Sequence, residues 1–203
     1  MKTGRQEDAG APEGLRARKR RQTRQRIAEA GLRLFLENGF EATTLDAIAA
    51  AADISRRTLF HYFDSKEAIL LAWKSGAEEA FRAALAEGSP DVIPLDAIRD
   101  AFLTVIGRYE TDEAIAIDRL MRSTEALRAR KQANYERQEQ TLFSALVERW
   151  PDPARRPALR LAAMVGVGVL RVAAETWSAE KGRRPLADYL QDAFVNLRTE
   201  MAQ

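Results

Sequence analysis

The side chains whose types and spacing best suit a chemical role lie in the segment 55–62, SRRTLFHY. If this segment is helical, a rotation of 100° per residue brings two arginines, a phenylalanine and the only histidine of the chain to one face: Arg56, Arg57, Phe60 and His61. Leu59 and Tyr62 fall on the opposite face. Arginine can bond both acceptors on the major-groove edge of guanine, an aromatic ring can contact thymine methyl groups, and histidine can donate to a phosphate or a base. The pattern therefore predicts a helix that reads a DNA groove.

Each of these side chains also has a competing interpretation. Arg56 and Arg57 could bind phosphates without reading bases, because most protein–DNA hydrogen bonds go to the backbone. Phe60 could pack in a core, and His61 could be a solvated surface histidine.

The surrounding sequence predicts the elements that would hold such a helix. Thr43 or Thr44 can cap a preceding helix, and the tight turn that follows falls at residues 52–54, where Asp53 tolerates a positive φ. Ser55 can then cap the groove-reading helix. A further helix is expected from Asp64 or Ser65 to about Glu87.

The whole chain of 203 residues reads as all-α, with about nine helices and no convincing strand pattern. We expect residues 1–22 to form a disordered basic arm, unless the first helix begins at Leu15, since no helix breaker appears before Asn38-Gly39. Residues 23–70 would form a three-helix helix-turn-helix domain and residues 71–203 a larger helical domain. Its later helices are expected at about 95–109, 112–122, 123–150, 154–179 and 186–201, with breaks at prolines and glycines.

Composition excludes several classes of function. The chain has no cysteine and one histidine, which excludes disulfides, thiolate catalysis and zinc–thiolate sites and disfavours any metal site. It has no glycine-rich phosphate loop and no nucleophile motif, so neither an enzyme nor a cofactor is expected. We also expect no membrane span and no signal peptide, and therefore a cytoplasmic protein.

Positive charge is concentrated at the N-terminus. Residues 1–26 hold nine Lys/Arg and three Asp/Glu, a net charge of +6, so that the other 177 residues sum to −4 within a total of +2. Blocks of like charge usually stay solvated and often serve as arms for nucleic acid. The position of this block before the groove-reading helix favours an arm that holds phosphates through Arg18, Lys19, Arg20 and Arg21.

Residues 23–70 resemble the DNA-binding domain of the TetR family of bacterial transcriptional repressors. The resemblance rests on Asn38-Gly39-Phe40, Thr43-Thr44, Ile54-Ser55, Thr58-Leu59-Phe60 and Tyr62-Phe63, and on Ile27–Phe35, Ile48-Ala49 and Lys66-Glu67. Asp53 departs from the family, which more often has glycine there. The resemblance implies a homodimer that binds a palindromic operator in double-stranded DNA and is released when a small molecule fills a pocket in the C-terminal domain. The predicted DNA-binding residues, besides the arm, are Thr43, Thr44, Ser55, Arg56, Arg57, Thr58, Phe60, His61 and Lys66.

The last two long helices are the expected dimer interface. The segment 161–170 is apolar on every side, and helix 186–201 carries an apolar stripe. TetR-like proteins dimerise through these two helices as a four-helix bundle, although a monomeric helical core would produce the same patterns.

The predicted effector pocket consists of bulky residues on the central helices and of two arginines that could neutralise an acidic ligand. They are Phe102, Ile106, Tyr109, Arg119, Met121, Arg122, Phe143, Met164 and Trp177. Residues 119–150 weakly resemble the TetR subgroup thought to bind acyl-CoA-like ligands, so the expected effector is small and hydrophobic or acyl-CoA-like. Ordinary core packing is the competing interpretation of the aromatic and Met residues. The competing function is an architectural or activating DNA-binding protein without an effector.

Overall fold

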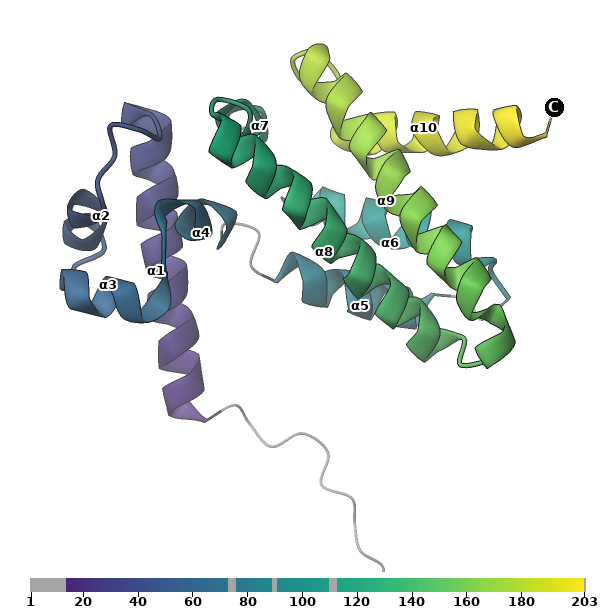
Figure 1. Cartoon of the computed structure of the whole chain (residues 1–203), viewed down its shortest axis with the longest axis horizontal. Helices are drawn as coiled ribbons and strands as arrows, with labels where there is room; N and C mark the ends of the chain where they lie inside the picture. The colour runs from purple at the N-terminus through teal and green to yellow at the C-terminus, as the bar shows by residue number, and fades with distance from the viewer. Residues whose placement is uncertain (1–13, 73–75, 89–90, 110–112, 203) are drawn as a thin grey trace, which may run out of the picture. The chain divides into compact units, whose positions relative to one another are not determined.

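A computed structural model describes residues 14–72, 76–88, 91–109 and 113–202, with the side chains of Arg108 and Tyr109 outside the description. Within these ranges every regular element is a helix (Figure 1). The ten α-helices and one short 3-10 helix are α1 (Leu15–Asn38), α2 (Leu45–Ala51), α3 (Arg56–Tyr62), α4 (Lys66–Leu71), α5 (Ala77–Glu87), α6 (Pro94–Tyr109), α7 (Ala114–Met121), α8 (Glu125–Arg149), η2 (Pro153–Arg155), α9 (Arg156–Ala179) and α10 (Leu186–Met201).

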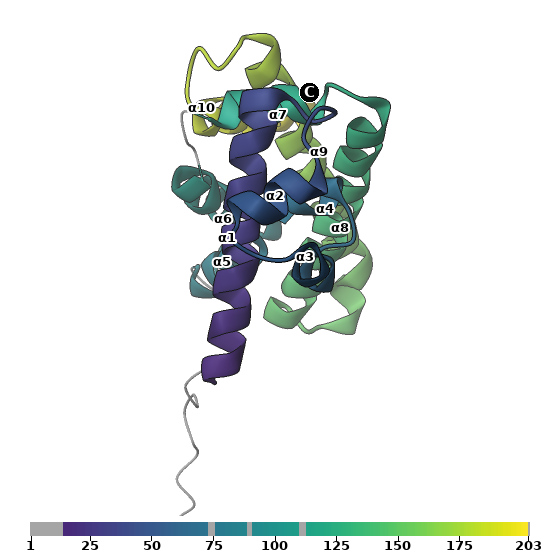
Figure 2. The same ribbon diagram turned by 90° about the vertical axis from the view of Figure 1, so that its left-hand side faces the viewer.

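The chain divides into two compact units, Met1–Trp73 and Lys74–Gln203. In the first unit α2 crosses α1 and α3 follows a tight turn (Figure 2). Leu59 and Ile69 are completely buried in this unit, together with Ile27 and Ile48. Gly31 allows α1 and α4 to pack closely, because a Cβ atom there would lie 2.4 Å from Ile69 Cγ2.

Helix α1 begins at Leu15, inside the basic segment, so the helical alternative is correct for residues 15–22. The first turns of α1 project beyond the other helices of the unit (Figures 1 and 2). The earlier part of the predicted arm, up to residue 13, lies outside the described residues.

The expectation of one helix from residue 64 or 65 to residue 87 is wrong. The structure has two helices there, α4 and α5, and Gly76 precedes α5 with φ of 95°. A residue in this left-handed conformation cannot continue an α-helix. This break accounts for the extra helix beyond the nine expected.

The second unit is a helical bundle in which α9 packs against α6, α8 and α10, and α5 packs against α6 and α8. Its core includes Phe81, Ile98, Leu146, Ala163 and Phe194. Gly166 faces this core, since a Cβ atom there would lie 2.7 Å from Ile98 Cγ2 of the same chain.

The segment Pro153–Ala179 contains a helix long and apolar enough to cross a membrane by length and composition alone. This differs from the expectation that no segment meets that criterion. The helix also supplies buried residues to the bundle, among them Leu159, Ala163 and Trp177. Core helices of globular domains meet the same criterion, so this feature by itself does not assign α9 to a membrane.

Candidate nucleic-acid interface

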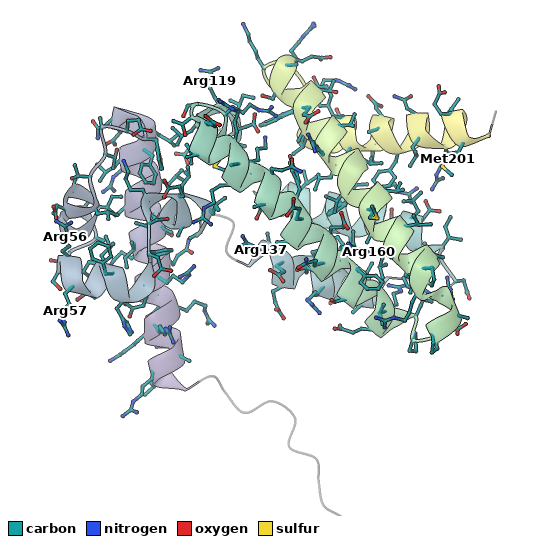
Figure 3. All side chains as sticks on the ribbon, in the orientation of Figure 1. Arg56, Arg57, Arg119, Arg137, Arg160 and Met201 are labelled. Carbon is teal, nitrogen blue, oxygen red and sulfur yellow. The ribbon has the colours of Figure 1, made fainter. Side chains whose placement is uncertain are left out.

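Helix α3 presents the predicted groove-reading face to solvent. Arg56, Arg57, Phe60 and His61 are all exposed, whereas Leu59 is completely buried. Phe60 is 44% exposed, which excludes the core-packing interpretation within its own unit. Figure 3 shows Arg56 and Arg57 at the outer edge of the first unit.

Local hydrogen bonds fix the ends of the helices around this face. The side-chain oxygen of Thr44 accepts from Ala47 N at 3.1 Å and caps α2, and Ser55 Oγ accepts from Thr58 N at 3.1 Å and caps α3. Ser55 and Thr58 also share a hydroxyl hydrogen bond of 2.8 Å. The turn between the helices contains Asp53 with φ of 51°, as predicted. These caps fix the residues at which α2 and α3 begin.

The two arginines of α3 have different surroundings. Arg56 Nη1 lies 2.9 Å from Asp46 Oδ2 of α2, and its guanidinium lies over the Phe60 ring at 5.6 Å. Arg57 makes no ion pair or ring contact with any residue that the structure describes. Asp46 therefore orients Arg56, while the guanidinium of Arg57 is available to a ligand.

Arg24 connects the basic helix to the end of α3, a role that the sequence did not reveal. Its Nη1 donates to the carbonyl of Tyr62 at 2.9 Å, and its guanidinium lies 4.3 Å from the centroid of the Phe63 ring. A guanidinium at the last carbonyls of a helix satisfies groups that have no partner inside the helix.

Thr43 does not lie on the exposed face, although the sequence placed it among the DNA contacts. The residue is 3% exposed, and its hydroxyl lies 3.1 Å from the carbonyl of Leu34 and 2.8 Å from that of Gly39. It fixes the connection between α1 and α2, and its side chain is not accessible to DNA.

Lys66 is also directed inward rather than towards a phosphate. Its ammonium donates to the carbonyls of Phe40 at 2.8 Å, Thr43 at 3.0 Å and Glu41 at 3.3 Å, and lies 4.7 Å from the centroid of the Phe40 ring. Three acceptors use all three donors of a lysine. Lys66 thus closes the loop between α1 and α2.

We expect Lys66→Met to lower the free energy of unfolding by about 2–3 kcal/mol, because the variant has no hydrogen bonds from a charged group and leaves carbonyls without a partner. Urea unfolding measures this decrease. The slope of log Kobs against log salt for DNA binding should stay unchanged. The matched control, Lys19→Met in the exposed arm, should leave stability unchanged and make that slope shallower by about 1 for each subunit. Unchanged stability and a shallower slope for Lys66→Met would instead show that Lys66 contacts a phosphate.

The predicted effector residues separate into two groups in the second unit. Phe102, Met121 and Trp177 are buried, and Ile106, Arg122 and Phe143 are half-buried. Arg119 and Met164 lie on the exposed surface, and the structure does not bring them together with the others. The Tyr109 side chain is outside the described residues.

A polar cluster in the same unit joins three helices. Asp118 of α7 accepts from Arg122 Nε at 2.8 Å and from Lys131 Nζ of α8 at 2.6 Å, and Ser178 of α9 also hydrogen-bonds to it. Burial alone would raise the pKa of Asp118, but these three hydrogen bonds together hold it below the ordinary value of 3.8. Asp118 is therefore a carboxylate at neutral pH.

Asp118→Asn should destabilise the protein by about 2–3 kcal/mol at pH 7, less than the removal of one partner from a fully buried pair because the Arg122 side chain is 37% exposed. A lowered folded-state pKa stabilises above the unfolded-state pKa, and this contribution disappears as the pH falls through the folded-state value. The difference between wild type and variant in urea unfolding should therefore shrink from pH 7 towards pH 3. A difference that grows in acid would contradict the assigned charge.

Two capped helices, a tight turn and an exposed basic and aromatic face define a helix-turn-helix of the class that docks in a DNA major groove. Comparisons with known proteins identify the family. Residues 27–73 match the family described as "Bacterial regulatory proteins, tetR family", and residues 92–202 match the "MftR C-terminal domain". The chain belongs to the TetR family of transcriptional regulators, a non-enzymatic family.

Individual relatives agree with this assignment. The regulator TcmR of Streptomyces glaucescens is 34% identical over 201 residues, which cover 93% of this chain and 88% of TcmR. UidR of Escherichia coli strain K12 is 46% identical over 50 residues, 25% of this chain and 26% of UidR. The crystal structure of Thermus thermophilus FadR, a TetR family repressor in complex with lauroyl-CoA, is 27% identical and has a TM-score of 0.56, with coverage of 84% of this chain and 91% of FadR.

Proposed function

We propose that this TetR-family regulator is a repressor that binds a palindromic operator as a homodimer in the cytoplasm and is released by a small effector. The observation that carries the proposal is the exposed face of α3, which is flanked by the side-chain cap of Ser55 at its own start and that of Ser65 at the start of α4. In helix-turn-helix proteins the N-terminal residues of the second helix contact base edges. Arg56 and Arg57 are the first two residues of α3, and therefore occupy that end.

Arg57 is the proposed base reader and Arg56 the oriented neighbour. The exposed guanidinium of Arg57 can reach the O6 and N7 atoms of a guanine. Arg56 is restrained by Asp46, an exposed pair that contributes little to stability but limits the orientation of the guanidinium. Thr44 and Ser55 use their side-chain oxygens for capping, and the Thr58 hydroxyl shares a hydrogen bond with that of Ser55. Phosphate binding there therefore falls to backbone N–H groups and to any remaining hydroxyl donor.

A second copy of the chain is the proposed cover for the apolar residues that remain exposed on α9 and α10. Leu161 is 61% exposed, Val172 is 56% exposed and Val195 is 62% exposed. Leu161, Met164, Gly168 and Val172 follow one another at spacings of three and four, so they form a single stripe on α9. A two-fold dimer would present two α3 helices to successive major grooves about 34–36 Å apart.

The proposed effector is hydrophobic or acyl-CoA-like and binds the second unit. This is supported by the match to the MftR C-terminal domain and by the lauroyl-CoA complex of Thermus thermophilus FadR. Phe102, Ile106, Met121, Phe143 and Trp177 supply apolar surface there. Effector binding and operator binding would then weaken each other by the same factor, since thermodynamic coupling is reciprocal. An architectural protein without an effector is the alternative.

Selection of bound sequences with wild type and Arg57→Ala tests the proposal. The variant should lose preference at one position of each half-site, by about 1–3 kcal/mol, while other positions keep theirs. Its matched control is Arg137→Ala, an exposed arginine on α8 of the second unit, which should leave every position unchanged (Figure 3). A uniform decrease in affinity over all sequences would make Arg57 a phosphate contact instead.

A further inference from the structure

The inner face of α8 contains a polar segment between apolar ends. Leu127 and Leu142 are buried, and between them the same stripe, at spacings of four, four, three and four, carries Lys131, Tyr135 and Gln138, which are half-buried. Polar side chains on the buried stripe of a helix are unfavourable unless they have partners. Helix packing alone therefore does not explain why this stripe carries polar side chains.

Two polar atoms in this region are fully buried and have no partner among the described protein residues. They are Arg122 Nη2, at the C-terminal cap of α7, a donor, and Gln138 Oε1 on α8, an acceptor. Arg122 Nε is already used by Asp118, so Nη2 is a separate, spare donor of the same guanidinium. Both side chains are related to Tyr135: the charge of Arg122 acts on its phenol, and Gln138 follows it by three residues on the same stripe of α8. Neither unpaired atom bonds to the other. A third group that accepts from Arg122 and donates to Gln138 would satisfy both.

The charges around these atoms favour an anion. Asp118 supplies one negative charge against the positive charges of Arg122 and Lys131, which leaves a net charge of +1 in a site where the Asp118 side chain is only 11% exposed. Burial and the nearby Asp118 raise the pKa of Tyr135 to about 12, so its phenol keeps its proton at neutral pH and adds a donor rather than a charge. Arg171, whose guanidinium lies 5.9 Å from the centroid of the Tyr135 ring, is neutralised by Glu175 at 3.0 Å.

We propose that Arg122 and Gln138 bind the polar end of the effector, with an anionic oxygen at Arg122 and an O–H or N–H group at Gln138. This inference rests on the proposed function and names the chemistry of its ligand. A purely hydrophobic molecule would leave both atoms unpaired, so the inference narrows the proposed effector to a molecule with an anionic oxygen and an O–H or N–H group. A free hydroxy acid and an acyl-CoA, with its phosphates and amide N–H groups, both carry the required chemistry.

Stability of the free protein gives the first test. Replacing an unpaired buried acceptor with an apolar side chain of similar size removes an unfavourable group, so Gln138→Met should raise the midpoint of thermal unfolding by roughly 2–4 °C. The matched control is Gln132→Met on the exposed side of α8, which should change little. A lower midpoint for Gln138→Met would mean that a trapped water already satisfies the amide, and would overturn the proposal.

Binding of a matched probe series gives the second test. The probes are 3-hydroxydodecanoate, dodecanoate, which lacks the hydroxyl group, and methyl 3-hydroxydodecanoate, which lacks the charge; lauroyl-CoA represents the second source. In calorimetry the hydroxy acid or lauroyl-CoA should bind, and Arg122→Met and Gln138→Met should each weaken that binding roughly 10- to 100-fold. Arg137→Met is the control and should not weaken it. If the source is a free hydroxy acid, both analogues should bind roughly 10- to 100-fold more weakly than 3-hydroxydodecanoate.

The probe series distinguishes a free hydroxy acid from an acyl-CoA and can also overturn the proposal. Tighter binding of lauroyl-CoA than of 3-hydroxydodecanoate, weakened in both variants, would assign the site to an acyl-CoA, and the opposite order would assign it to a free hydroxy acid. No binding of any probe, or binding that both variants leave unchanged, would overturn the inference. Operator binding without a probe should be the same in wild type and in the Arg137→Met control. Its absence in wild type would instead contradict the proposed function.

Discussion

Leu161→Glu combined with Val172→Glu is expected to convert the proposed dimer to a monomer and to weaken operator binding by about 10²–10⁴-fold, the gain that a second linked binding module usually contributes. Both side chains are more than half exposed in the single chain, so a carboxylate at either position would be well solvated in a monomer. In a four-helix interface the same carboxylates would be buried without a partner. Sedimentation and operator titration measure the two effects.

The control places the same charges on another exposed surface of the second unit. Gln132→Glu and Gln140→Glu on α8, which change the net charge by the same −2, should leave both the mass and the affinity of the wild type. A double variant of α9 that remains a dimer would remove α9 from the interface. A wild type that is monomeric and still binds the operator tightly would contradict the two-fold arrangement altogether.

Removal of the helical basic arm is expected to weaken binding to every DNA sequence. Compared with a chain that starts at Gly14, a chain that starts at Gln22 lacks Arg16, Arg18, Lys19, Arg20 and Arg21, five cations per subunit. The slope of log Kobs against log salt is negative, and each phosphate that the shortened chain no longer neutralises should make it shallower by about 0.9. The magnitude of the slope should therefore decrease by several units. Because these residues lie on a helix continuous with the buried part of α1, they are held near one position relative to α3.

A chain that starts at Gly14 is the matched control, because it retains all five of these cations and lacks only the cations Lys2 and Arg5. It should keep most of the salt dependence of the full chain. Weaker binding to the specific site alone, at unchanged salt dependence, would show that the arm does not hold phosphates.

Local patterns predicted most of the fold because local chemistry determines it. Apolar periodicity and the breakers at Asn38-Gly39, Pro153 and Gly182 predicted the later helices to within a few residues. The break at Gly76 was missed because a single glycine between good helix formers is often tolerated inside a helix, and only its φ of 95° shows otherwise.

The candidate sites were predicted less completely, because their side chains act through partners far away in the sequence. The exposed face of α3 follows from helical geometry alone. Lys66 and Thr43, in contrast, were assigned to DNA, whereas Lys66 bonds carbonyls 23–26 residues earlier in the chain and Thr43 is buried. The partners of Arg122 and Gln138 likewise depend on how α7, α8 and α9 pack, which periodicity does not reveal.

Selection of genomic fragments by the purified full chain would decide whether this protein is a sequence-specific regulator. The fragments come from the source genome, and the enriched sites are sequenced. We expect a palindrome with half-sites one helical turn apart, upstream of a small number of operons, and disappearance of that enrichment when the effector is added. Broad enrichment without a motif would contradict a sequence-specific regulator and favour the architectural alternative.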